Sequence, residues 1–490
     1  MKKVLTTGIA AAILPIILFS RCTTDNEQDT LHYVNLSQAA CTFLGEGNQP
    51  LAITVKASPG DWTAEPGATW VKIERTDAKT LTVIVEDNDS GAERNTVIDI
   101  AAGQAAQEIL VNQLAKDNEF ARYRRLETFQ MGAAMSPSGR YMGGFTASVA
   151  ADDSWQYSPT IVDLETGETF QFGPFPEALY YLSQTMAITD QGLLFISDGF
   201  HGGQIAIDTT GDIFIPEAPA GFQFKPEIQA TSADGKYWVG FAVDAPIGEG
   251  MYRPLLWTDG VPEVLPMPDK NFRGEEFWVG IMARGMSADG SVIYGTSWEN
   301  SDFGMVYWKD GLVDWVGKDV HVLTPVVMQM GDGTEYDYNL ANGMVCTANL
   351  TNISATGKWI AGSYRTEEQA ENKISVVTTQ TAAFYNTETE TTTIVDDYGE
   401  STGTHVTDDG IAFIGIGSLG ISSSVVYDLN THTDLGSMED WVYDTYGIII
   451  PSGFVNQVAP DGRFVLGTRM QSSAMGASFA SWYIAPPIEK

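Results

Sequence analysis

The chain has 490 residues, enough for two or three domains, and 43% of them are hydrophobic, which excludes general disorder. It carries 63 acidic and 27 basic side chains, a net charge of −36, so its surface would repel nucleic acid, which we exclude as a partner. Its 49 Gly, 12 Trp, 19 Tyr and 22 Phe favour an all-β fold, because Gly marks turns and aromatic residues suit half-buried strands.

The N-terminus has the pattern of an export signal. Lys2 and Lys3 precede an apolar run from Gly8 to Phe19. This run is too short to cross a bilayer as a helix and has the length of a signal-peptide core. We therefore expect a signal peptide over residues 1–21.

A linker over residues 22–30 follows the signal peptide. Cys22, which follows the apolar core after Ser20 and Arg21, resembles the lipidated cysteine of bacterial lipoproteins, although Arg21 stands where that motif has a small residue. The acidic stretch 23–29 is similar to the surface-export signal of lipoproteins in the Bacteroidetes, and a plain solvated linker is the alternative. The resemblance implies an exported protein with lipid on Cys22, held at the outer membrane and facing the cell surface.

Residues 31–114 show the alternation of short β-strands separated by turn clusters, as expected for an immunoglobulin-like β-sandwich. Trp62 and Trp70 are expected to fill its core. The ordered landmarks are Trp62, Trp70-Val-Lys-Ile, Leu81-Thr-Val-Ile-Val, Asn88, Arg94 and Ile109-Leu-Val-Asn-Gln. This set resembles the BACON domain, a family that is often N-terminal and associated with carbohydrate binding. The resemblance implies a carbohydrate-related role, or a spacer that holds a second domain away from the membrane.

Residues 120–490 contain seven copies of a short phrase such as Thr231-Ser-Ala-Asp-Gly-Lys-Tyr-Trp-Val-Gly. The phrase joins two strands through a tight turn whose glycine needs positive φ, and its last glycine allows close backbone approach. A second hairpin follows each copy, so each repeat supplies the four strands of a propeller blade. The turn glycines of the copies are Gly139, Gly192, Gly235, Gly290, Gly357, Gly410 and Gly462.

The last repeat lacks its outer strand. The segment that begins at Arg122 can supply it, so we expect a seven-bladed β-propeller closed by an N-terminal strand, which removes a free sheet edge. The Ser-Ala-Asp-Gly phrase resembles HAF-type extracellular repeats, and Met135-Ser-Pro-Ser-Gly-Arg-Tyr is similar to the repeats of TolB-type propellers. These resemblances imply the architecture and no activity.

Long loops, among them residues 318–350, 364–380 and 438–454, are expected on one face of the propeller. Binding sites are usually built from such loops. Their aromatic and polar side chains could stack on sugar rings and bond hydroxyl groups, or could simply pack the loops on the blades. The candidate ligand-binding residues are Trp155, Tyr157, Phe200, His201, Trp298, Glu299, Tyr364, Arg365, Trp441 and Tyr443.

The sequence gives no sign of catalytic chemistry. The five histidines have no metal-ligand spacing, so we expect no metal site and no cofactor; Ca²⁺ at Asp332, Glu335 and Asp337 is the alternative to a solvated loop. We expect a non-catalytic surface lipoprotein that binds a glycan through the long-loop face. The alternatives are a structural or protein-interaction propeller of an outer-membrane complex, with a surface protein as partner, or a glycoside hydrolase or lyase.

Overall fold

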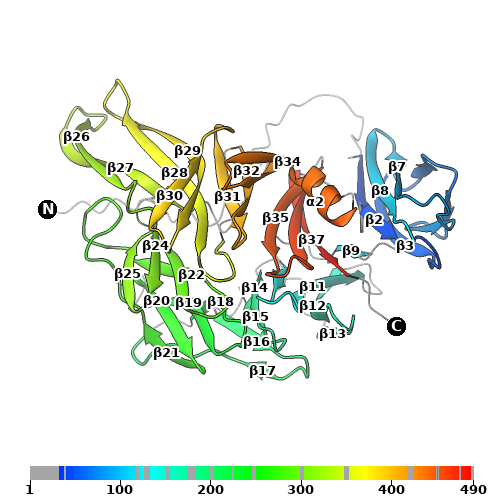
Figure 1. Ribbon diagram of the computed structural model, residues 1–490, viewed down its shortest axis with the longest axis horizontal. Coiled ribbons are helices and arrows are strands. Elements are labelled where there is room, and N and C mark those ends of the chain that lie inside the picture. The colour runs from blue at the N-terminus through cyan, green and yellow to red at the C-terminus, as the bar shows by residue number, and fades with distance from the viewer. Residues whose placement is uncertain are drawn as a thin grey trace, which may run out of the picture.

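The protein is almost entirely β-structure, as the composition predicts (Figure 1). The computed structural model describes residues 32–37, 40–116, 122–125, 133–149, 155–173, 184–198, 203–222, 226–245, 250–297, 299, 303–346, 352–417, 423–448, 450, 452–473 and 476–486. No helix within these ranges is long and apolar enough to cross a bilayer.

The N-terminal part is a sandwich of two four-stranded sheets, with the orders β1-β3-β6-β5 and β2-β8-β7-β4. Their alternating apolar residues meet in one core that contains Trp62. Trp70 packs only at the margin of this core, with the Arg94 guanidinium 4.5 Å from its ring centre. The strands are β1 (Tyr33–Leu36), β2 (Ala40–Phe43), β3 (Leu51–Ser58), β4 (Thr63–Pro66), β5 (Val71–Arg75), β6 (Thr80–Val85), β7 (Arg94–Ala102) and β8 (Ala105–Gln113).

Seven further sheets lie in the described residues after position 120, each an antiparallel series of neighbouring strands. The first three are β10 (Ala134–Met135), β11 (Tyr141–Val149), β12 (Trp155–Asp163) and β13 (Thr169–Gln171); β14 (Gln184–Ile188), β15 (Leu194–Asp198), β16 (Gly203–Ile207) and β17 (Ile213–Phe214); and β18 (Glu227–Thr231), β19 (Tyr237–Val243), β20 (Tyr252–Thr258) and β21 (Val261–Val264).

The fifth of these seven sheets has five strands, and each of the other six has four. The fourth and fifth are β22 (Ile281–Met286), β23 (Val292–Ser297), β24 (Met305–Lys309) and β25 (Leu312–Trp315); and β26 (Val322–Gln329), β27 (Glu335–Val345), β28 (Trp359–Gln369), β29 (Val376–Asn386) and β30 (Thr391–Val395). The last two are β31 (Ser401–Val406), β32 (Ile411–Ile416), β33 (Ser423–Asp428) and β34 (Thr433–Ser437); and β35 (Gly453–Val458), β36 (Val465–Ser473), β37 (Gly476–Ala485) and β9 (Arg122–Arg125).

The repeated phrase forms the turn between the first two strands of six of these sheets, and in the fifth sheet it forms the turn between β27 and β28. All seven turn glycines have positive φ, for example 68° at Gly235 and 88° at Gly410. The closing glycine of the phrase permits close packing: a Cβ atom on Gly240 would lie 1.8 Å from the carbonyl oxygen of Glu227. Both roles are those predicted from the sequence.

Each sheet shares a buried apolar cluster with the next, and the last sheet shares one with the first. This succession is the packing of a β-propeller. One pair of residues from each shared cluster is Ile161 with Leu194, Ala206 with Ile228, Val239 with Ile293, Tyr307 with Tyr385, Phe384 with Ile414, Phe413 with Val465, and Met142 with Leu466.

The last sheet takes its outer strand from the N-terminal side of the propeller. β9 pairs antiparallel with β37, and Tyr123 lies opposite Ile484. This pairing was predicted from the missing strand of the seventh repeat. The count of seven blades for the whole ring stays a prediction.

Three segments expected as long loops contain regular structure. Residues 318–350 hold the hairpin β26–β27, and residues 364–380 continue β28 and β29 past the blade as a second hairpin. The third segment holds the helix α2 (Met438–Tyr446), which begins at the N-cap Ser437 and ends at Gly447 with φ of 64°. The fifth sheet and the α2 region therefore carry structural elements that the other sheets in the described residues do not share.

Candidate functional site

The fifth sheet carries a two-hairpin projection, which we call the arm and define as residues 322–342 and 366–380 (Figure 1, upper left). The two hairpins touch near their tips. The backbone amide of Gln329 donates to the carbonyl of Lys373 at 2.8 Å, and the side-chain Nε2 of Gln369 donates to the carbonyl of Val327 at 2.6 Å. The arm is therefore one unit rather than two independent hairpins.

A buried ion pair holds the base of the arm on the propeller. Arg273, in the connection between β21 and β22, donates to both carboxylate oxygens of Glu367 on β28, at 2.9 and 2.8 Å. The same guanidinium donates to the carbonyl of Asn339 on β27 at 2.7 Å, and the amide of Ala341 donates to Glu367 at 2.9 Å. Burial alone would raise the pKa of Glu367, but these bonds and the nearby Arg365 outweigh it and hold the pKa below its usual value.

Stacked rings next to this ion pair hold the same connection. Phe272 lies parallel to the His321 ring, with ring centres 4.5 Å apart, and edge-on to Trp315 at 5.4 Å. His321 Nε2 lies 2.9 Å from the carbonyl oxygen of Phe272. Burial lowers the pKa of His321 despite this carbonyl, so the ring is neutral near neutral pH and donates from Nε2. The base of the arm is thus fixed by apolar and polar contacts together.

The outer surface of the arm is rich in large apolar side chains. Seven of the eighteen exposed large hydrophobic side chains in the described residues belong to it, with exposures between 37% and 56%. They are Val322, Leu323, Val327, Met330, Tyr336, Ile374 and Val377. Scattered apolar side chains are normal on a surface, but a group on one projecting element indicates an interaction site.

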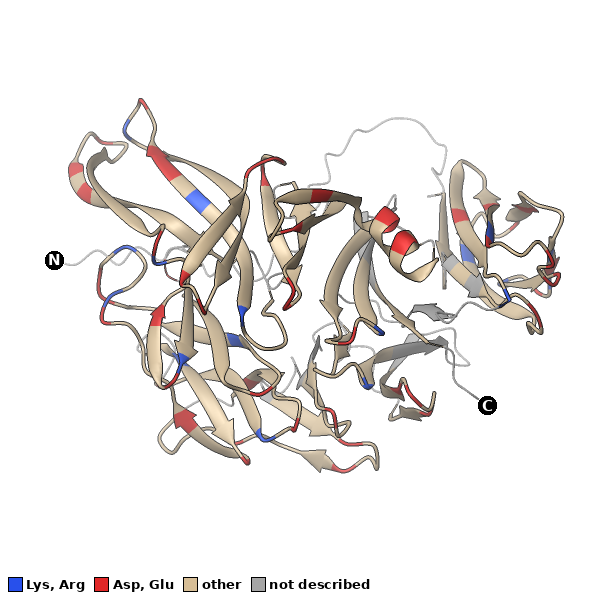
Figure 2. Cartoon of the chain, in the orientation of Figure 1, with Lys and Arg blue, Asp and Glu red and all other residues tan. Residues whose placement is uncertain are grey.

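Acidic residues outnumber basic ones along the arm (Figure 2). Exposed carboxylates of the arm are Asp332, Glu335, Asp337, Glu368 and Glu371, and Lys373 is its exposed cation. Hydrogen bonds from Thr334 lower the pKa of Asp332, which keeps it ionised. The described residues hold no group of three His, Cys, Asp or Glu side chains that could bind a metal ion.

Glu299 and Arg365 of the predicted ligand set lie inside the protein. Glu299 Oε1 accepts the amides of Trp278, Val279 and Gly280, and Oε2 accepts the Asn271 side chain at 2.7 Å. Glu299 therefore shapes the β21–β22 connection. Arg365 is buried 3.4 Å from Glu367, beside the ion pair of Arg273.

Tyr364, Trp441 and Tyr443 differ in exposure. Tyr364 packs on the cluster between the fourth and fifth sheets, and Trp441 packs edge-on to Phe413 at 5.0 Å. Tyr443 on α2 is 42% exposed. Tyr364 thus lies on β28 with Arg365, whereas Trp441 and Tyr443 lie on α2.

The side chains of the other predicted residues lie outside the described part of the structure. Trp155 and Tyr157 are placed in β12 by their backbone, and their side chains are not described. Phe200, His201, Trp298 and Cys22 lie outside the described residues altogether. Their role in binding stays a prediction.

Part of the sandwich matches a known protein family. Residues 60–114 match the BACON family. That family is described as "Putative binding domain, N-terminal". The match confirms the resemblance seen in the order of Trp62, Trp70 and the strands that follow. No curated protein matches the chain.

Solved structures with similar folds include other propellers. The β-propeller domain of the Trilobed protease from Pyrococcus furiosus is 10% identical, with a TM-score of 0.36, over 83% of this chain and 95% of that one. A protein of Agrobacterium tumefaciens described as a TolB is 12% identical, with a TM-score of 0.34, over 68% and 98%. A DUF4623 family protein from Bacteroides eggerthii is 10% identical, with a TM-score of 0.28, over 90% of each chain. Likeness at this level carries no argument about activity or ligand.

Proposed function

We propose that the chain is a non-catalytic binding protein whose propeller docks a partner protein on the arm. The observation that carries this proposal is the concentration of seven exposed apolar side chains on one projecting element. A fixed surface loses little conformational freedom on binding, and the buried Arg273–Glu367 pair fixes the base of this one. Tethering at the outer membrane through Cys22 is part of the same proposal.

The charge of the arm specifies the partner. Its exposed carboxylates outnumber its exposed cations, so it should select an apolar surface bordered by Lys and Arg. A second copy of this chain is a poor occupant, because each copy carries a net charge of −36 and the two acidic arms would repel.

The test compares two variants of the full chain. The arm variant is Val327→Ser/Met330→Ser/Ile374→Ser/Val377→Ser. The control, Ile213→Ser/Val261→Ser/Val264→Ser/Leu312→Ser, removes the same number of exposed apolar residues from outer strands of other sheets. The probe is a fluorescent peptide of alternating Val and Lys, beside one of alternating Val and Glu. Fluorescence anisotropy should show binding of the basic peptide by wild type and control, with affinity at least about tenfold weaker for the arm variant.

Two further readouts decide between contact at the arm and general attraction to an acidic protein. Equal binding of the basic peptide by all three proteins would contradict the proposal, since net charge alone would then explain it. In cells, a photo-crosslinking residue at Ile374 should form adducts with a protein, whereas one at Leu312 should not. Equal adducts at both positions would also count against the arm.

Glycan binding is the second candidate. Trp278 favours it, because its side chain is 59% exposed while Glu299 fixes its backbone, as suits stacking on a sugar ring. A glycan array of the full chain beside Trp278→Ala tests this candidate independently of the arm: binding lost in the variant supports it, and silence of the wild type removes it.

A further inference from the structure

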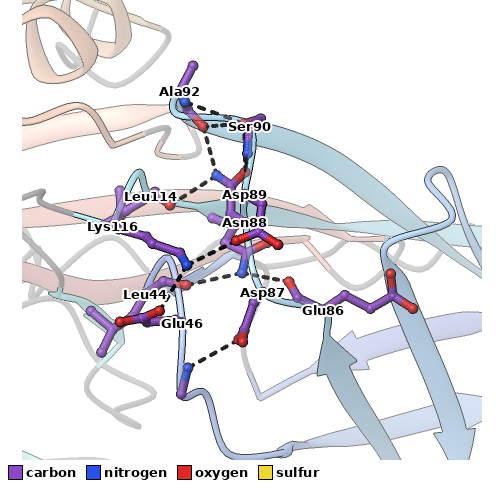
Figure 3. Close-up of polar contacts among 12 residues, drawn as sticks. Leu44, Glu46, Glu86, Asp87, Asn88, Asp89, Ser90, Ala92, Leu114 and Lys116 are labelled. Carbon is purple, nitrogen blue, oxygen red and sulfur yellow. Dashed lines mark hydrogen bonds and ion pairs between the residues drawn. The ribbon is translucent and has the colours of Figure 1, made fainter.

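The chain leaves the sandwich through a fixed junction rather than a loose connection (Figure 3). The amide of Leu114 donates to the carbonyl of Phe43 at 2.9 Å, and Asn88 Nδ2 donates to the carbonyl of Leu114 at 3.1 Å. Two residues on, Lys116 Nζ lies 2.9 Å from both Glu46 and Asp89. The backbone from the end of β8 is thus bonded to the sandwich.

The Leu114 side chain belongs to the core of the propeller. Leu114 is 1% exposed and lies in the cluster formed by the sixth and seventh sheets and α2, together with Met438, Val442 and Trp482. Leu110 on β8 and Trp441 on α2 pack against the same cluster. One residue therefore has its backbone bonded to the sandwich and its side chain buried in the propeller.

Helix α2 provides the propeller side of this junction and is itself well anchored. Ser437 accepts the amide of Asp440 at 3.1 Å at its N-terminus, and Tyr446 donates to the carbonyl of Gly462 at 2.8 Å near its end. In Figure 1 the helix lies between the seventh sheet and β2 and β8 of the sandwich.

A polar contact crosses the junction beside Leu114. Glu93 of the sandwich lies close to Tyr443 of α2, and its negative charge, with burial, raises the pKa of that tyrosine. The same sandwich segment carries Asn88, which holds the Leu114 carbonyl. Strand β2 also lies against β9, the strand that completes the seventh sheet. Apolar, polar and strand contacts thus occur on the same side of the sandwich.

We propose that α2 and Leu114 lock the sandwich onto the propeller, so that the two domains form one rigid body. The small domain then sets a fixed orientation of the propeller, and with it of the arm, relative to β1, the first strand of the sandwich. A flexible spacer would leave that orientation free. The proposal is independent of what the arm binds.

The test uses the full chain with Cys22→Ser and spin labels on cysteines introduced at the exposed residues Glu65 and Thr431. The native Cys41 is unreactive because burial raises its pKa to about 12, and Cys346 is buried too. Pulsed electron paramagnetic resonance measures the distribution of distances between the two labels. Wild type should give one narrow distribution and Leu114→Asp a broad one.

The matched control is Leu44→Asp, at an exposed leucine on the same end of the sandwich. It should keep the narrow distribution. Hydrogen exchange of Leu114→Asp should show lost protection in α2 with unchanged protection in β3 and β6, which excludes unfolding of the sandwich as the cause. A milder variant, Glu93→Gln, should show a smaller loss in α2. A broad distribution in wild type, or a narrow one in Leu114→Asp, would overturn the proposal.

Discussion

At the scale of single residues, the arm depends on two opposite charges taken out of water. Arg273 and Glu367 have side-chain exposures of 5% and 3%, so removing Glu367 leaves Arg273, and Arg365 beside it, as buried cations without this carboxylate. Glu367→Gln should lower the free energy of unfolding by about 3–5 kcal/mol in urea denaturation, because it leaves the Arg273 charge uncompensated. Glu371→Gln, at an exposed carboxylate of the same hairpin, should change it by less than about 0.5 kcal/mol.

The lowered pKa of Glu367 gives this pair a pH dependence. Its stabilisation is complete above the pKa of an unfolded glutamate and is lost as the pH falls through the lower pKa of the folded state. The wild type should therefore lose more stability than Glu367→Gln on acidification below about pH 4. Parallel losses in the two proteins would show that the pair contributes no net charge interaction.

His405 predicts a second pH effect with a different range. Its Nε2 accepts the amide of Val458 at 3.2 Å, and burial lowers its pKa to about 4. The unfolded histidine takes up a proton below about pH 6.5 whereas the folded one does not until about pH 4, so stability falls across this range by about 1.4 kcal/mol per pH unit. In His405→Gln, whose side chain can still accept the amide, thermal midpoints should fall less between pH 7 and pH 5. The same slope in both proteins would contradict the prediction.

At the scale of elements, the sequence predicts the hairpins that recur in every repeat and misses the elements that occur in only one. Seven copies of one phrase reveal the hairpins, because a tight turn and a close approach need glycine at fixed positions such as Gly235 and Gly240. The helix α2 was readable too: Ser437 and Asp440 stand at capping spacing and Gly447 at the end, but a search for strands passes over them.

The arm and its ion pair could not be found in the same way. The segment Val322–Gln329 alternates poorly and contains Pro325, which argues against a strand. It forms one because β27 pairs with it and the neighbouring hairpin covers Met328. Arg273 and Glu367 are 94 residues apart in the sequence, and only the packing of the fourth and fifth sheets brings them together. Glu299 was selected as a ligand-binding residue for its place in a loop, whereas the fold uses it to bind three amides.

At the scale of the whole molecule, the four-residue strand β9 joins the N-terminal side of the propeller to its last sheet. Strand β9 pairs with β37 of the last sheet, while the first sheet packs on the same sheet through Met142 and Leu466. Removing β9 would expose the edge of β37 to other chains and release the N-terminal side of the ring. We therefore expect loss of β9 to destabilise all the sheets of the propeller together. Loss of an outer strand that belongs to the same repeat as its sheet should affect that sheet alone.

The variant Tyr123→Pro/Arg124→Pro tests this closure in the full chain. Amides of successive residues in a strand point to opposite sides, so one of the two prolines must remove a hydrogen bond to β37. The control, Thr169→Pro/Phe170→Pro, makes the same change in β13, the outer strand of the first sheet. Hydrogen exchange should show lost protection in β37 for the β9 variant, with a lower thermal midpoint and self-association, while the β13 variant should lose protection only in its own sheet. If both variants behave alike, β9 is an ordinary edge strand, and the apolar clusters between sheets suffice to hold the ring.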